Sequence, residues 1–179
     1  MLDLMIAYGM GPGRLYDELN GQGFPCTRDE AKQLFYRYCD TYKSAVGFLR
    51  ESGKLAASQG YLVNLNGRRR YWIKPETDNP DYYGRMAGIE REGGNFLIQS
   101  VNADITKDAI IGIREYRKKN NIRTHFINAV YDEVVTRTHK DDSEAFHAAK
   151  LKIMVASAEK WIKDVPMIVD GHAGKCWQK

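Results

Sequence analysis

Two β-rich runs separated by three residues constrain the fold of this chain more than any other feature. Residues 125–130 and 134–138 are rich in β-branched and aromatic side chains, and residues 131–133 lie between them. Such a pair of runs predicts an antiparallel hairpin. The rest of the chain shows mainly helical spacing, so the predicted helices must pack against small sheets. The sequence therefore indicates the α+β class.

A second hairpin is predicted around Asn66-Gly67. Residues 61–65 read as a strand and residues 69–73 as the returning strand. Both turn residues tolerate positive φ, which makes this dipeptide a strong hairpin signal. Three arginines, Arg68 to Arg70, follow the turn and could bind a duplex backbone through bidentate phosphate contacts. A solvated surface turn is an equally good interpretation of the three arginines.

Helices are predicted around the two hairpins. Thr27 begins a long one, because Glu30 three residues later completes a capping box. Apolar side chains continue at helical spacing as far as Leu49, and we expect that face to be core. Gly93-Gly94 should break the later helical region, and a last strand is expected at the edge of a sheet over residues 166–169. The predicted helices cover residues 2–8, 14–20, 27–49, 80–92, 95–119 and 141–162.

Composition excludes some classes of protein. No stretch of the 179 residues approaches the roughly 18 apolar residues needed to cross a bilayer. Cys26, Cys39 and Cys176 are too few and too widely spaced for a disulfide framework or a zinc site. We therefore expect a cytoplasmic protein with no membrane partner. The net charge of +4 is a mild indication of a polyanionic partner.

Asp132 and Glu133 are the sharpest chemical feature. They are adjacent carboxylates at the tip of an apolar hairpin, where strands hold side chains firmly. Carboxylate oxygens are the ligands that Mg²⁺ prefers, and Mg²⁺ usually takes only one or two carboxylates from a protein. The alternative is that both are ordinary turn residues, since Asp is common in turns.

Two further segments carry candidate binding residues. Arg91, Asn95 and Gln99 are spaced by four, so they lie on one helix face and suit phosphate and base-edge contacts. A solvated polar stripe would give the same pattern. Tyr8, followed by Gly9, precedes a glycine-rich break, and its ring could stack on a base or belong to the core.

In this order, the segments resemble the C-terminal portion of family A (bacterial polymerase I-like) DNA polymerases. Tyr8-Gly9 is similar to the end of motif B. Gly60-Tyr61 and the following Gly67-Arg68-Arg69-Arg70 resemble a segment of the family, as does the stretch from Glu90 to Asp104. Residues 131–133, Tyr-Asp-Glu, fall on motif C, which is usually His-Asp-Glu. The resemblance covers nearly the whole chain.

The resemblance implies a partial polymerase palm, an antiparallel sheet with the motif C hairpin, plus fingers helices. Residues 1–94 would be the fingers portion with the connecting hairpin, and residues 95–179 the C-terminal palm portion. Asp132 would bind catalytic Mg²⁺, with Glu133 in support. Tyr8 and Gly9 would shape the site for the deoxynucleoside triphosphate. The residues expected to contact primer–template DNA are Arg68, Arg69, Arg91, Asn95, Gln99 and Tyr131.

The chain also departs from the family pattern. Tyr131 replaces the usual histidine, and motif A, the thumb and the lysine and arginine of motif B have no counterpart. We therefore expect the chain to polymerise only with an N-terminal polypeptide, in a bacterial or phage-infected cell. Two alternatives remain: a non-catalytic DNA-binding or structural module on the same scaffold, and an inactive gene fragment or a piece prepared for crystallisation.

Overall fold

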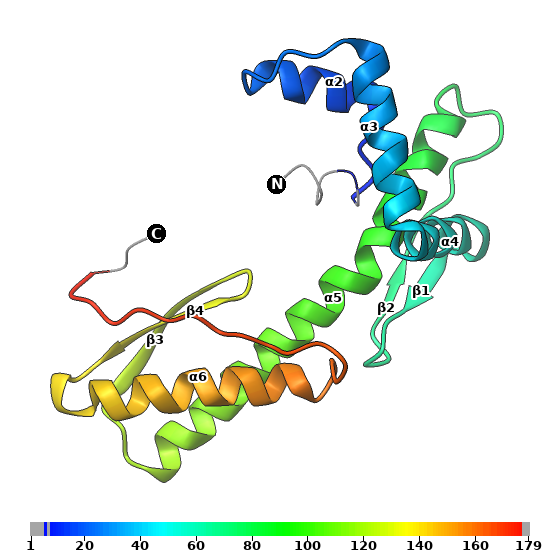
Figure 1. The fold of residues 1–179 in the computed structure, drawn as a ribbon. Helices are drawn as coiled ribbons and strands as arrows, with labels where there is room; N and C mark the ends of the chain where they lie inside the picture. The colour runs from blue at the N-terminus through cyan, green and yellow to red at the C-terminus, as the bar shows by residue number, and fades with distance from the viewer. Residues whose placement is uncertain (1–5, 7, 177–179) are drawn as a thin grey trace. The chain divides into compact units, whose positions relative to one another are not determined.

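A computed structural model describes Ile6 and residues 8–176 of the chain (Figure 1). The predicted helix over residues 2–8 lies mostly outside these residues. Helices and two small antiparallel sheets confirm the α+β prediction. The chain forms two compact units, residues 1–98 and 99–179, whose boundary falls within the helix α5. In the described part of the chain, no helix is both long and apolar enough to cross a membrane.

The first unit begins with α2 (Pro12–Gly21) and α3 (Arg28–Thr41). The predicted capping box is confirmed: the Thr27 amide donates to Glu30 Oε2 at 2.7 Å, and Thr27 Oγ1 accepts from the Glu30 amide at 3.2 Å. Leu15 and Leu19 of α2 form a core with Ala31 of α3. The two helices are thus held together by an apolar face.

The predicted long helix from Thr27 to Leu49 is wrong, because the chain bends at Tyr42. α3 ends at Thr41, Tyr42 has φ −106° and ψ 38°, and α4 (Lys43–Gln59) follows. Leu34 and Tyr42, expected on the core face, are exposed. The bend lets the two helices bury different faces: α3 packs against α2, whereas α4 buries Ser52, Gly53, Ala56 and Ala57.

α5 (Tyr82–Lys119) continues through Gly93-Gly94, so the predicted break is wrong. A Cβ on Gly93 would overlap that of Ala56 in α4, and a Cβ on Gly94 would lie 2.8 Å from the Leu49 carbonyl oxygen. Glycine in a helix costs about 1 kcal/mol relative to alanine. Here the close packing of α5 against α4, which the two glycines permit, offsets this cost, and the helix continues through them.

The first hairpin consists of β1 (Tyr61–Val63) and β2 (Arg69–Tyr71), each shorter than predicted. Asn64 closes the loop: its Oδ1 accepts from the amides of Asn66 at 3.0 Å and Arg68 at 2.9 Å. Gly67 has a positive φ of 76°, but Asn66 does not. The turn is therefore longer than the two-residue Asn66-Gly67 turn that the sequence indicated.

The second unit contains β3 (Thr124–Val130), β4 (Glu133–Thr138), the short helix η1 (Lys140–Asp142) and α6 (Ser143–Glu159). The predicted hairpin is confirmed, with Glu133 paired to Val130 rather than in the turn. Ile113 of α5, Val134 of β4 and Phe146 of α6 form the core. A bulge interrupts the β3–β4 register between Phe126 and Asn128.

The chain after α6 differs from the prediction. Residues 166–169 form no strand, and α6 ends at Glu159 rather than near residue 162. A strand exists only through hydrogen bonds to a neighbour, and no described segment supplies that neighbour here. The β propensity of these residues is therefore not realised in a ladder.

Candidate functional site

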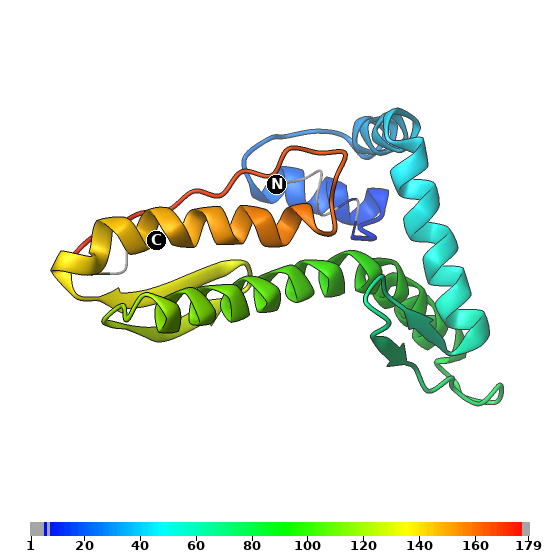
Figure 2. The ribbon, with the colours of Figure 1, turned by 90° about the horizontal axis from the view of Figure 1, so that it is seen from below.

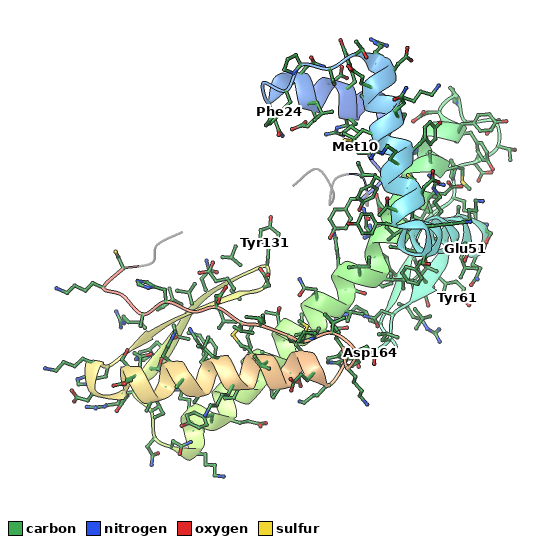
Figure 3. The ribbon with its side chains drawn as sticks, in the orientation of Figure 1. Met10, Phe24, Glu51, Tyr61, Tyr131 and Asp164 are labelled. Atoms are coloured by element: carbon green, nitrogen blue, oxygen red, sulfur yellow. The ribbon has the colours of Figure 1, made fainter. Side chains whose placement is uncertain are left out.

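Tyr131 and Asp132 form the two-residue turn of the β3–β4 hairpin. Tyr131 has φ 56° and is 91% exposed, and it projects from the tip of the hairpin (Figure 3). A bulky residue with positive φ is uncommon and is often found at functional sites. Asp132 and Glu133 are exposed beside it. The hairpin thus presents two carboxylates and a phenol at one edge of the second unit.

Buried neighbours fix this tip. Val134, directly after the two carboxylates, is buried against Ile113 and Phe146. Lys150 of α6 donates from Nζ to the Val134 carbonyl at 3.2 Å. Burial lowers the pKa of Lys150, while attraction to Glu133 acts in the opposite direction. Sequence reasoning missed Lys150. The sign in the sequence that it faces the hairpin is its position one helical turn after Phe146.

The carboxylate set is small. Among the described residues, no group of three or more His, Cys, Asp or Glu side chains is placed to hold a metal ion. A cation bound at Asp132 and Glu133 would therefore take its remaining ligands from water, from a substrate or from chain segments outside this structure.

The three arginines of the first hairpin have different environments. Arg70 pairs with Leu62, which is buried, so this face of the hairpin turns toward α5. There Arg70 forms an ion pair with Glu92 and lies 5.0 Å from the Trp72 ring centre. Trp72 Nε1 also donates to Glu92, at 3.0 Å. Arg70 therefore holds the hairpin against α5.

Arg68 and Arg69 are exposed, as a phosphate-binding role requires. Arg69 pairs with Val63 on the opposite face of the hairpin from Arg70. A hydrogen bond with Tyr71 raises the pKa of Arg69 above its usual value. Both side chains are thus accessible to a large partner.

Four predicted residues meet at one cavity of about 360 Å³ in the first unit: Tyr8, Gly9, Arg91 and Asn95. Gly9 has φ 93°, and a Cβ there would lie 3.1 Å from Arg91 Cγ. Gly9 therefore provides both the backbone conformation and the space that the arginine stem requires. Gln99 is exposed two helical turns beyond Arg91 on α5.

Arg50 and Lys54 of α4 line the same cavity. Sequence reasoning missed them, because they lie far from Tyr8 and Arg91 along the chain. Their four-residue spacing, which places both on one face of α4, was the available signal. The cavity lining thus carries three basic residues, Arg50, Lys54 and Arg91, and one acidic residue, Glu90.

Comparison with solved structures identifies the class of protein. The chain is similar to the polymerase domain of Pol1 from M. smegmatis, solved in a complex with DNA primer-template and dNTP. The TM-score is 0.73 and the identity 27%, over 87% of this chain and 26% of that chain. The arrangement of helices and hairpins is thus that of part of a polymerase domain.

Sequence comparison then defines the family. The model of DNA polymerase family A matches residues 2–179, and the chain belongs to that family. It is 30% identical to DNA polymerase I of Treponema pallidum over 174 residues, which cover 96% of this chain and 16% of the relative. It is 28% identical to DNA polymerase I of Bacillus subtilis over 87% of this chain and 17% of the relative. The chain thus spans about a sixth of the length of these relatives.

Proposed function

We propose that this chain is the C-terminal part of a template-directed DNA polymerase, which adds deoxynucleotides to the 3′ end of a primer. The exposed Asp132-Glu133 pair at the β3–β4 tip is the observation that carries the proposal. Membership of DNA polymerase family A supports the class of reaction. The chain spans about a sixth of the length of these relatives, and we propose that motif A and the rest of motif B reside on an N-terminal polypeptide that completes the enzyme.

Asp132, with Glu133 in support, fits Mg²⁺, because its hard carboxylate oxygens are exposed on a turn whose next residue is buried. When bound, the metal offsets negative charge on the attacking 3′-oxygen and the leaving pyrophosphate. Tyr131 stands where the family has histidine, and its hydroxyl is accessible to the primer terminus.

The remaining candidate residues bind DNA and nucleotide. Arg91, Asn95 and Gln99 contact the primer–template, since arginine and amide groups bind phosphates and the acceptors of the minor groove. Tyr8 and Gly9 border the nucleotide site. The two exposed arginines of the first hairpin hold the duplex backbone. The enzyme works in the cytoplasm of a bacterial or phage-infected cell.

The test is primer extension by the chain combined with its completing polypeptide. We expect Asp132→Ala to reduce incorporation by several orders of magnitude, because loss of a ligand removes several kcal/mol of transition-state stabilisation. Asp164→Ala, an exposed carboxylate away from the turn, should retain activity. Near-normal extension by Asp132→Ala would refute the assignment of this residue, and extension by the isolated chain would refute the need for a partner.

A further inference from the structure

The face of the β1–β2 hairpin that turns away from α5 carries exposed aromatic rings. Alternate residues of a strand point to the same side, so this face consists of two cross-strand pairs, Tyr61 with Tyr71 and Val63 with Arg69. Tyr71 is 66% exposed and Tyr61 38%. Figures 1 and 2 show the hairpin beside α4 and the N-terminal part of α5. The described part of the first unit thus leaves this face largely uncovered.

The two rings are held in place from both sides of the hairpin. Their centres lie 5.8 Å apart, with 33° between the ring planes. Aromatic pairs of this kind, on neighbouring strands, stabilise a hairpin. On the opposite face Leu62 is buried, and Arg70 forms its ion pair with Glu92 of α5. The rings therefore form an aromatic platform on a hairpin that is already anchored.

Positive charge lies beside the aromatic platform. Residues 60–74 contain no Asp or Glu, and their basic residues are Arg68, Arg69, Arg70 and Lys74. Arg69 lies on the same face as Tyr71 and donates a hydrogen bond to it. A phosphate bound by Arg69 would therefore lie next to a base stacked on Tyr71. Exposed rings beside arginines are typical of surfaces that bind single strands of nucleic acid.

We propose that this face binds single-stranded nucleic acid, with unpaired bases stacked on Tyr61 and Tyr71. Arg68 and Arg69 bind the phosphates of the same strand. In a duplex the faces of the bases are covered by their neighbours, so a duplex could use the arginines but not the rings. The single strand that a template-directed polymerase meets is its unpaired template, and this source rests on the proposed function.

Binding of oligonucleotides to the full chain tests the role of the ring. The probe is a fluorescent oligodeoxythymidine of about twelve nucleotides, within the usual site size of such surfaces. Fluorescence anisotropy measures its affinity. Tyr71→Thr removes the ring and keeps a residue that favours strands, and we expect it to weaken binding about tenfold. Tyr71→Phe keeps the ring and should bind within about twofold of the unaltered chain.

An abasic strand of the same length is the matched control for the ligand, because it keeps the phosphates and lacks the bases. The unaltered chain should bind it about tenfold more weakly than oligodeoxythymidine, and Tyr71→Thr should cause no further loss. Tyr36→Ala, which removes an exposed ring of α3, should leave binding unchanged. For a blunt duplex, Arg69→Ala should weaken binding, whereas Tyr71→Thr should not.

No measurable binding, or equal affinity of the unaltered chain for oligodeoxythymidine and the abasic strand, would overturn the proposal. An equal loss in Tyr71→Phe and Tyr71→Thr would also overturn it, because the ring would then not be the determinant. A parallel loss of duplex binding in Tyr71→Thr would assign the rings to support of the hairpin instead. Base-dependent binding by the chain without primer extension by the completed enzyme would refute the proposed function alone.

Discussion

At the scale of single residues, the absence of a side chain decides how closely two helices approach. Gly53 of α4 lies against the main chain of Glu90 in α5, and a Cβ there would overlap the Glu90 carbonyl oxygen. Gly47, on the same helix, has nothing within 4 Å of where its Cβ would lie. The two glycines therefore allow a matched comparison of close packing with helix propensity.

Gly53→Ala should destabilise the protein by about 1–3 kcal/mol, because overpacking against a main chain cannot be relieved by a rotamer change. Gly47→Ala should be neutral or stabilising by up to about 1 kcal/mol, because alanine favours the helix. Urea denaturation of both variants gives the free energies of unfolding. Equal effects at the two positions would contradict the packing that we describe for α4 and α5.

At the scale of elements, one carboxylate joins the start of β3 to the start of α6. Asp142 Oδ2 accepts from the Arg123 amide at 3.0 Å and from Arg123 Nε at 2.9 Å. Asp141 lies 3.3 Å from Arg123 Nη2. The side-chain hydrogen bond from Arg123 is the main cause that lowers the pKa of Asp142 to about 2.

This lowered pKa makes stability depend on pH in a defined window. The folded state favours ionised Asp142, so its stabilisation is present above the ordinary pKa of 3.8 and is lost as the pH falls toward about 2. Asp142→Asn should lower the thermal unfolding midpoint near neutral pH. In this variant the midpoint should also decrease less as the pH falls through this window. Thermal unfolding as a function of pH measures both effects. Asp170→Asn, an exposed residue away from Arg123, serves as the control, and identical profiles for the two variants would contradict the pairing.

At the scale of the whole molecule, the charge distribution bears on binding to nucleic acid. The chain has 27 basic and 23 acidic residues. All three arginines of the first hairpin are exposed, and Arg70 is in addition engaged by Glu92 and Trp72. Arg68 and Arg69 are therefore the arginines of this run whose contact with a long polyanion we test.

Arg68→Ala and Arg69→Ala should each weaken binding of a primer–template duplex with little dependence on its sequence. Each lost phosphate contact should also reduce the slope of log affinity against log salt by about one. Titrations at several salt concentrations measure this slope, and Arg37→Ala, an exposed arginine on α3, is the control. Unchanged slopes for both hairpin variants would show that these arginines do not contact the duplex.

Local signals in the sequence were sufficient for part of the fold and of the candidate site. The capping box of Thr27 and Glu30 and the hairpin around Asp132 both form as predicted. In each case the hydrogen bonds that define the feature join residues only a few positions apart. Asp132 and Glu133 could be named as the candidate carboxylates from the sequence, because the hairpin that presents them is formed by residues close together in the chain.

Contacts between distant segments decided the rest. α5 continues through Gly93 because α4 packs there. The chain bends at Tyr42, between α3 and α4, because these two helices bury different faces. The cavity that gathers Tyr8 with Arg91 and the hydrogen bond from Lys150 to β4 likewise join residues far apart in the chain. Residues 166–169 have the composition of a strand but form none, because a strand requires hydrogen bonds to a neighbour, which no local sequence can supply.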